Sequence, residues 1–363
     1  MPAHLNAPVY FSLSGWIGGS TAQALLDQDQ AVRAAGGWAI ASSVRIFNRD
    51  GLNITLPVSA VLSWVDGFIG CGAEISRARW QTMTGHRSRQ PIQGIRFDRA
   101  AIMGVLNVTP DSFSDGGDHE SHQAAVSAAR SMIEAGANII DMGGESTRPG
   151  ADPVSHQDEW QRVSDVVSDV AQIACVSIDT RHADTAERAV AAGAVWINDV
   201  MAGQGPGMLA VMARSGVPVV LMHSMGKPKT MQEDPHYDHV VMDVFDTLQQ
   251  RIDAAISAGV ARDRILIDPG IGFGKTFEHN LTLIRHLSCF HALGCPILFG
   301  ASRKSLINSI SRAPVAKDRL SGSLFLAIEA VKQGCQVVRV HDVFETRQAL
   351  DMYEAMYVDS GSD

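Results

Sequence analysis

The chain has 363 residues, of which 45% are hydrophobic and 19% are charged, and its formal net charge at pH 7 is −9. This composition indicates a globular protein with a full hydrophobic core, and the length allows one large and one small domain. The acidic balance argues against a general nucleic-acid-binding protein. Because no window approaches about 18 consecutive apolar residues and no signal-peptide pattern opens the chain, we expect no membrane association.

The cysteines indicate the redox environment. They are odd in number and scattered, without a CxxC pair, which predicts reduced thiols in a cytoplasmic protein rather than a disulfide framework or a cysteine metal site. The positions are Cys71, Cys175, Cys289, Cys295 and Cys335.

Residues 1–95 differ in pattern from the rest of the chain and predict a small accessory α/β extension. Glycines interrupt this region, strands are expected at 38–46 and 54–64, and a helix is expected at 21–34. Residues 82–93 read as a linker. The Trp, Phe and Ile content favours an ordered unit over a disordered tail. We find no catalytic constellation in it, and its role stays open.

Residues 96–363 alternate short apolar runs with helical patterns, such as the one at 124–133. Continuous Val, Ile and Leu runs separated by helices predict parallel strands that are covered on both faces. Their number and spacing match a (β/α)8 TIM barrel, and a doubly wound open sheet is the competing architecture. The expected strands are 102–107, 138–142, 175–179, 195–198, 217–223, 264–268, 296–300 and 337–341.

Polar residues stand at or just beyond the ends of these runs. Asp, Asn and Ser at such positions could simply cap the helices that follow. Capping does not explain Arg339 and His341 in the same set, whereas the carboxyl ends of barrel strands form the catalytic face of this fold. The set comprises Asn107, Asp141, Asp179, Asn198, Asp199, His223, Asp268, Ser302, Arg339 and His341.

The loops after the first two strands contain glycine, hydroxyl and charged groups. Residues 107–117 hold two carboxylates and a Gly-Gly pair, and residues 143–150 place Thr147 and Arg148 between glycines. Both loops are candidate mobile covers over a site, and solvated turns are the alternative. Whether Asp111 or Asp115 touches a substrate stays open.

Two later loops predict anion or ligand contacts. Residues 268–276 are rich in glycine, but position 269 is Pro, so the phosphate-binding P-loop pattern fails. Residues 302–305 precede a helical stretch at 306–311 and combine two cations with two hydroxyls, which indicates an anion site; an exposed basic turn is the alternative. His223 is interpreted as a rim residue that orients its neighbours. No His, Asp and Glu spacing resembles a tight metal cage.

Seven segments, each at a strand end and in the same order, closely resemble the dihydropteroate synthase family. The resemblance covers residue 100 to the C-terminus, and residues 1–95 lie outside it. The segment HSMG at 223–226 departs from the HMQG that is common in the family. The matching segments are LNVTPDSFSDGG (106–117), GESTRPG (144–150), SIDT (177–180), IND (197–199), DPGIGFGK (268–275), SRKS (302–305) and RVH (339–341).

This resemblance implies a transferase of folate biosynthesis. The family joins 4-aminobenzoate to the methylene carbon of (7,8-dihydropterin-6-yl)methyl diphosphate and releases diphosphate. It implies that Asp268, Asn198 and Lys304 bind the pterin. Asp179 is expected to contact the pterin and to oppose positive charge on the methylene carbon. Asp179, Lys304 and Arg339 are therefore the expected catalytic residues.

The remaining sites are also implied by the resemblance. Arg339 and His341 are expected to bind the diphosphate, with Thr147 and Arg148 closing over it. Ser305 is expected to bind the carboxylate of 4-aminobenzoate. Asn107 is the expected ligand of Mg2+, which would arrive mainly with the diphosphate and water because a single amide holds it weakly. A homodimer is possible.

Two alternatives remain at this level. A pterin-binding methyltransferase that serves a corrinoid protein would share Asp179, Asn198 and Asp268 but would not need Arg339 and His341. A non-catalytic pterin-binding paralogue would have lost some of these positions, and all of them are present.

Overall fold

A computed structural model describes residues 3–87, 91–108, 118–145, 153–226 and 233–358. In these residues an eight-stranded parallel sheet runs in the order β12-β11-β10-β9-β8-β7-β14-β13. A parallel bridge between Ile267 and Ile297 joins its two ends into a barrel. The predicted (β/α)8 barrel is therefore confirmed. Its strands are β7 (Ala101–Asn107), β8 (Ile139–Gly143), β9 (Val176–Asp179), β10 (Trp196–Asp199), β11 (Val219–Met222), β12 (Ile265–Asp268), β13 (Leu298–Phe299) and β14 (Val337–Val340).

Alternate residues of the barrel strands enter two different cores, because successive side chains of a strand point to opposite faces. In β7, Ala101 and Met103 join an inner cluster that also contains Trp196. Ile102 and Leu106 join the larger cluster that includes the helices. Burial on both faces explains why these strands read as continuous apolar runs.

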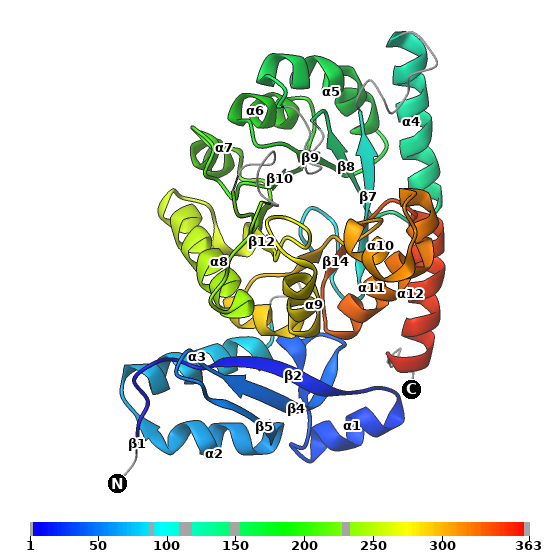
Figure 1. Cartoon of the computed structure of the whole chain (residues 1–363). Coiled ribbons are helices and arrows are strands. Elements are labelled where there is room, and N and C mark those ends of the chain that lie inside the picture. Colours follow the sequence, from blue (N-terminus) through cyan, green and yellow to red (C-terminus); the bar gives the residue numbers. More distant parts are fainter. Residues whose placement is uncertain (1–2, 88–90, 109–117, 146–152, 227–232, 359–363) are drawn as a thin grey trace.

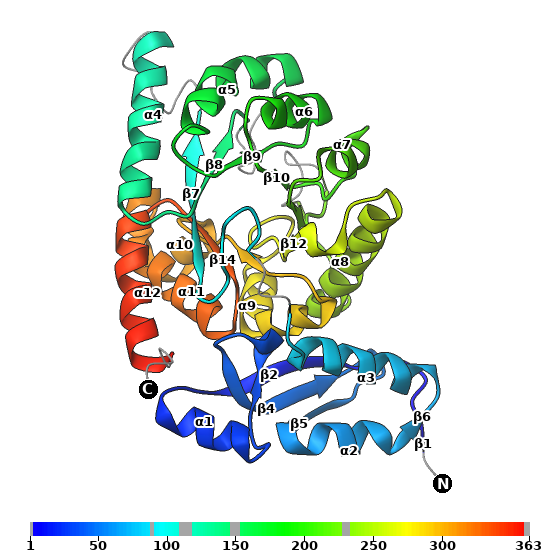
Figure 2. The same ribbon diagram turned by 180° about the vertical axis from the view of Figure 1, so that it is seen from behind.

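Helices surround the strands on all sides (Figures 1 and 2). The last helix, α12, packs against α11 and β7. The α-helices are α4 (Asp118–Glu134), α5 (His156–Val170), α6 (Ala183–Ala191), α7 (Met208–Ser215), α8 (Val240–Ser257), α9 (Phe277–Arg285), α10 (Ser305–Ser311), α11 (Leu320–Lys332) and α12 (Val343–Tyr357). Short 3-10 helices are η4 (Arg262–Arg264), η5 (Leu287–Leu293) and η6 (Ala316–Arg319).

The N-terminal region folds around an antiparallel sheet in which β4 pairs with β2, β3 and β5. Figures 1 and 2 show this sheet below the barrel, with α3 on the side that faces the barrel and α1 and α2 on the other side. The elements are β1 (Ala3–His4), β2 (Tyr10–Ile17), α1 (Ser20–Asp27), β3 (Val32–Arg33), η1 (Ala34–Gly36), β4 (Ile40–Phe47), β5 (Asn53–Pro57), η2 (Val58–Ala60), α2 (Val61–Asp66), β6 (Phe68–Ile69) and α3 (Cys71–Thr84).

Several boundaries predicted for this region are wrong. The helix expected at 21–34 ends at Asp27, because the chain turns through Asp29 with a left-handed φ of 55° and continues as β3. The strand expected at 54–64 ends at Pro57, and its second half is the amphipathic helix α2. The expected linker begins inside α3, while β2 and α3 themselves were missed.

The N-terminal region and the barrel share one continuous core. Phe11, Trp38 and Trp80 are buried in the same cluster as barrel residues such as Phe245 and Phe290. Polar contacts join the two parts as well: the Tyr10 hydroxyl donates to Asp246 of α8 at 2.8 Å. The extension is thus packed against the barrel rather than tethered to it.

None of the helices in the described part of the chain is both long and apolar enough to cross a bilayer.

Candidate active site

The ends of β8, β9 and β10, which are neighbours, and of β14, which lies beyond β7, bring an arginine together with acidic and amide side chains. Arg339 of β14 donates from Nε to Oδ2 of Asp141 at 2.6 Å and from a terminal nitrogen to Oδ2 of Asp179 at 2.7 Å. The amide of Asn198, from β10, donates to the same Asp141 oxygen at 3.1 Å. The predicted residues Asp179, Asn198 and Arg339 therefore meet in one network, as carboxyl ends of barrel strands allow.

This network leaves buried polar atoms without partners. Oδ1 of Asp141, Oδ1 of Asp179 and the hydroxyl of Ser177 make no hydrogen bond within the described residues. Burial raises the pKa of Asp179, and the charge of Asp141 adds to this, while the Arg339 charge opposes it. Buried polar atoms without partners are rare in structural cores, so these atoms are available to a ligand.

Asp268 and Lys304 form the second part of the site. Asp268 ends β12 and accepts the main-chain N–H of Gly270 at 2.7 Å. Lys304 donates to the carbonyl of Ile271 and lies 4.6 Å from the centre of the Phe273 ring. Burial lowers the pKa of Lys304 to about 8, although the charge of Asp268 counteracts it. Both predicted residues thus line the glycine-rich loop after β12.

The segment 302–305 is only partly available to an anion. Arg303 pairs with Asp342, and its Nε to Oδ2 distance is 3.0 Å, so this guanidinium serves the fold rather than a ligand. The Ser302 hydroxyl lies 3.0 Å from Nδ1 of His341 and links strands β13 and β14. Ser305 begins α10 and is exposed.

Asn107 is the last residue of β7 and is half-buried, with Gly143 as its neighbour in β8. Its amide oxygen is a hard ligand of the kind that Mg2+ accepts. The donor chemistry therefore fits a magnesium ion that retains water and phosphate ligands. Thr147, Arg148, Asp111 and Asp115 lie outside the described residues.

Another cluster near β8 and β9 contains residue types that bind metals, but its side chains already make ion pairs and hydrogen bonds with neighbouring residues. Donor atoms of Glu145, Glu159 and His182 lie within 4.8 Å of one another. Arg181 donates to both oxygens of Glu145 at 2.8 and 2.9 Å, and Thr180 donates to Glu159 at 2.7 Å. An arginine on the acid disfavours a cation there, so the cluster shapes the loops beside the site.

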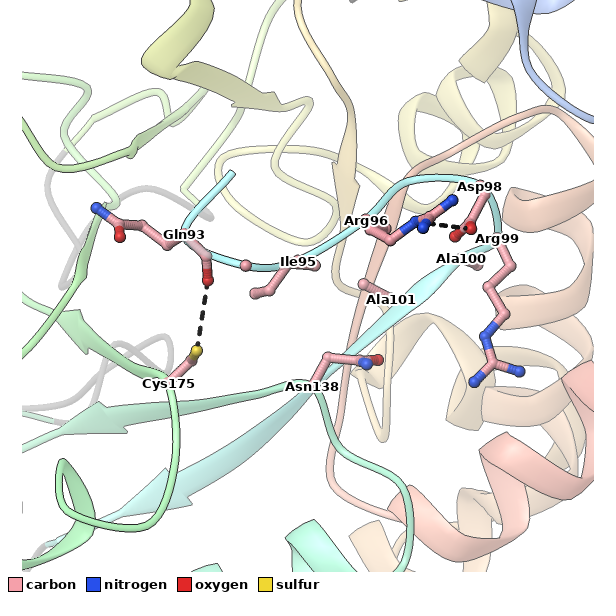
Figure 3. A pocket seen from close by; sticks show the side chains of 10 residues that line it. Gln93, Ile95, Arg96, Asp98, Arg99, Ala100, Ala101, Asn138 and Cys175 are labelled. Atoms are coloured by element: carbon pink, nitrogen blue, oxygen red, sulfur yellow. Dashed lines mark hydrogen bonds and ion pairs between the residues drawn. The ribbon is translucent and has the colours of Figure 1, made fainter. Parts of the chain in front are cut away.

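A cavity of about 380 Å3 opens at the opposite end of the barrel (Figure 3). It lies beside Ala101, Asn138 and Cys175, which precede or begin strands β7, β8 and β9, and residues 93–100 cover it. In this fold the chemistry belongs to the carboxyl ends of the strands. The cavity is therefore not the candidate active site.

Sequence reasoning gave no role to two residues that the structure places in this region. Asp141 was noted only as a strand end, yet it accepts from both Arg339 and Asn198. Lys275 was part of a quoted motif and is buried with its amine under the glycine-rich loop. An ionisable residue inside an apolar run was the available signal for Asp141.

Comparisons with known proteins agree on one family. A sequence profile described as "Pterin binding enzyme" matches residues 103–341. Dihydropteroate synthase from Escherichia coli strain K12 is 48% identical over 256 residues, which is 70% of this chain and 90% of that protein.

Solved structures give the same result. Dihydropteroate synthase from Xanthomonas albilineans with 4-aminobenzoic acid has a TM-score of 0.69 at 43% identity, covering 72% of this chain and 96% of that one. The same enzyme in complex with 7,8-dihydropteroate has a TM-score of 0.66 at 42% identity, covering 72% and 95%.

Proposed function

This chain belongs to the dihydropteroate synthases, a family of pterin-binding enzymes, and we propose that it condenses 4-aminobenzoate with (7,8-dihydropterin-6-yl)methyl diphosphate. The products are 7,8-dihydropteroate and diphosphate, in folate biosynthesis. The observation that supports this most directly is the buried network of Arg339, Asp141, Asp179 and Asn198 at the carboxyl ends of the strands. Relatives that this chain matches over 90% or more of their own length are named dihydropteroate synthases.

The pterin is assigned to the Asp268 side of the site. A carboxylate at Asp268 can accept from a ring N–H and the amino group, and Asn198 offers both a donor and an acceptor. Lys304 can donate to the carbonyl edge, in exchange for its present contact with the Ile271 carbonyl. All three side chains belong to strand ends or to the loop directly after one, which holds them on rigid elements.

The diphosphate is assigned to cations on β14 and the loops beside it. Arg339 and His341 would bind it, and Thr147 and Arg148 would close over it. Binding of the diphosphate would partly replace the acids that now pair with Arg339. Mg2+ held by the diphosphate, water and the Asn107 amide would neutralise charge on the leaving group. Asn107 would orient that assembly at the mouth of β7.

The nucleophile needs positioning rather than a strong base. An arylamine is neutral at pH 7, and its carboxylate would rest against Ser305 at the start of α10. Asp179 would oppose positive charge as it develops on the methylene carbon. We infer a dissociative reaction in which diphosphate departs before the amine attacks. A normal secondary deuterium isotope effect at the methylene is expected, and a near-unit or inverse effect would contradict this order.

One steady-state assay separates this function from its alternatives. The protein is supplied with the pterin diphosphate, Mg2+ and 4-aminobenzoate, and diphosphate release is measured. Turnover that depends on 4-aminobenzoate supports the synthase. Activity only with a methylated folate donor would support the corrinoid methyltransferase, and pterin binding without turnover would support a non-catalytic paralogue.

We also propose that the enzyme forms a homodimer through the last helices and works in the cytoplasm. Large apolar side chains are exposed on α11 and α12, namely Phe325, Phe344, Met352 and Met356. Several large apolar side chains exposed on two helices that contact each other are typical of a protein interface. Unpaired thiols at all five cysteines support a reducing compartment. Light scattering of Phe325→Glu against the parent chain tests the dimer, since a monomeric parent would refute it.

A further inference from the structure

The glycine-rich loop at 269–276 packs directly against the segment that follows β11. Gly270 and Gly274 have φ values of 69° and 62°, in the left-handed region. A Cβ atom at Gly270 would lie 1.8 Å from the His223 carbonyl oxygen, and one at Gly274 would lie 2.6 Å from that of Met225. The loop therefore needs glycine at both positions. It is neither helix nor strand, so its carbonyl groups must be paired in another way.

The amine of Lys275 hydrogen-bonds to two of these carbonyl groups. Its Nζ lies 2.9 Å from the carbonyl oxygen of Gly270 and 3.0 Å from that of Phe273. The same nitrogen lies 2.9 Å from Nδ1 of His223 and 3.5 Å from the His223 carbonyl. Lys275 is 3% exposed, so water does not compete for these contacts. One side chain thereby joins the loop after β12 to the residue after β11.

The surroundings of Nζ suit an ammonium ion rather than a neutral amine. An ammonium ion has three hydrogens for the three contacts of 3.0 Å or less, to the carbonyls of Gly270 and Phe273 and to Nδ1 of His223, whereas a neutral amine has two hydrogens and would have to accept from an Nδ1–H of His223. Burial lowers the pKa of Lys275 well below its usual value, while the charge of Asp268 acts in the opposite direction. The carbonyl dipoles thus take the place of a carboxylate partner.

An ammonium donor also decides the tautomer of His223. The imidazole is buried, and burial together with the charge of Lys275 lowers its pKa well below its usual value, so the ring is neutral. If Nδ1 accepts from Lys275, the single ring proton must lie on Nε2. The neighbouring hydroxyl of Tyr237 donates to the Gly274 carbonyl at 2.8 Å and holds the same loop from the outside.

The part of the loop that Lys275 holds is the part that receives Lys304. Phe273, whose carbonyl accepts from Lys275, presents its ring 4.6 Å from Nζ of Lys304. Between the two carbonyls that Lys275 binds lies Ile271, whose own carbonyl accepts from Lys304. A shift of this loop would therefore displace Lys304 and, through Gly270, the hydrogen bond to Asp268.

We propose that Lys275 is a positioning residue for pterin binding, whose ammonium group fixes the 269–276 loop beneath Lys304 and Asp268 and holds His223 in the Nε2–H tautomer. This role rests on the proposed function for its substrate and on the contacts of Nζ for its geometry. It gives His223 a defined role at the rim of β11, as the acceptor that links two loops.

The kinetic test compares Lys275→Met with Lys332→Met, which removes the same charge from the surface of α11. We expect the KM for the pterin diphosphate to rise about tenfold or more in Lys275→Met, with a smaller fall in kcat, since one lost charged contact is worth about that factor. Lys332→Met should match the parent. Lys275→Arg, which keeps the charge, should recover part of the loss.

A purely structural role would give a different pattern. The active fraction and the melting temperature of Lys275→Met would then fall while the KM of the remaining active enzyme stayed unchanged, and this result would overturn the proposal. Unchanged kinetics with an unchanged melting temperature would also overturn it.

The tautomer is read independently by 15N NMR of the histidine rings, with His223→Gln used for assignment. We expect a neutral His223 with its proton on Nε2 in the parent protein and a changed tautomer in Lys275→Met. A proton on Nδ1 in an active parent enzyme would overturn the Lys275–His223 link alone. A parent protein that binds the pterin diphosphate without turnover would instead overturn the proposed function, and the tautomer would still decide the link.

Discussion

The two ends of the barrel differ in what their buried polar groups contact, although each end keeps some of these atoms without a partner in the described residues, Nε of Arg87 and Nδ1 of His291 at the junction among them. At the carboxyl end, Asp141 and Asp179 each keep one buried oxygen without a partner in the described residues. At the junction with the N-terminal extension, Arg87 donates to the carbonyls of Cys295 and His291 at 2.8 and 2.6 Å. Trp38 donates to the Val331 carbonyl at 2.9 Å in the same interface.

This difference separates groups that serve chemistry from groups that serve folding. Polar atoms at the carboxyl end are buried but left available, which costs stability and gives a ligand something to bind. Those at the junction are mostly used to attach one part of the chain to the other. Changes at the first region should therefore alter turnover, and changes at the second should alter stability.

Asp179→Asn tests the first half of this comparison with the largest expected effect. We expect kcat to fall about 100-fold or more, because an amide cannot oppose positive charge at the methylene carbon as a carboxylate does. Arg339→Ala should act similarly by removing the partner of both acids. Diphosphate release is the measurement, with circular dichroism to show that the variants fold. Turnover near that of the parent would contradict the assigned roles.

Removal of residues 1–90 tests the second half. The deletion exposes barrel surface that now packs against Phe11, Trp38 and Trp80, so solubility and the free energy of unfolding should fall sharply. Arg87→Ala is the milder version, and it should cost about 2–4 kcal/mol because two carbonyls lose a charged donor. Turnover per folded molecule should change little in both. A loss of kcat in folded Arg87→Ala would show that the extension contributes to catalysis.

Acid should weaken the junction through two histidines. Burial lowers the pKa of His286 to about 4 and that of His291 to about 3, and the nearby charges of Arg45 and Arg87 act in the same direction. The folded state therefore keeps these rings neutral, while the unfolded state takes up protons below its pKa of 6.5.

Because the unfolded state binds these protons and the folded state does not, a lower pH reduces the free energy of unfolding. Each histidine should reduce the free energy of unfolding by about 1.4 kcal/mol per pH unit below 6.5, levelling off near its own folded pKa. Denaturant unfolding between pH 7 and pH 4 measures this. His286→Gln should flatten the profile, and an unchanged profile would mean that His286 is not the group that titrates.

The barrel could be predicted closely because its strands are apolar on both faces and its helices are amphipathic. The strand expected at 264–268 is β12 at Ile265–Asp268, for example. The extension was harder, since its half-buried strands and small helices lack a strong period. β5 alternates between exposed and half-buried residues and is followed by the 3-10 helix η2 and then by α2, so one pattern merged three elements.

Residue types at strand ends predicted where the site lies, but they did not predict which side chains pair with one another. Asp179, Asn198 and Arg339 were expected in one place and meet there. The hydrogen bonds of Arg339 to Asp141 and of Arg303 to Asp342 depend on side-chain geometry across strands, which no spacing in the sequence reports. The function of the barrel came from the family resemblance, whereas the attachment of the extension came only from the structure.

Asn107 and Asn138 give the most specific test of the difference between the two ends of the barrel, and the expected effect is the smallest. Asn107 ends β7 at the carboxyl end, and Asn138 precedes β8 at the other end, where its Oδ1 accepts the Ile102 N–H at 2.8 Å. Asn107→Ala should raise the Mg2+ concentration for half-maximal turnover about two- to threefold, because one neutral amide adds little to a metal that phosphate and water already hold. Asn138→Ala should lower the melting temperature and leave that concentration unchanged. Loss of activity in Asn107→Ala at every Mg2+ concentration would show that the protein, and not the diphosphate, holds the metal.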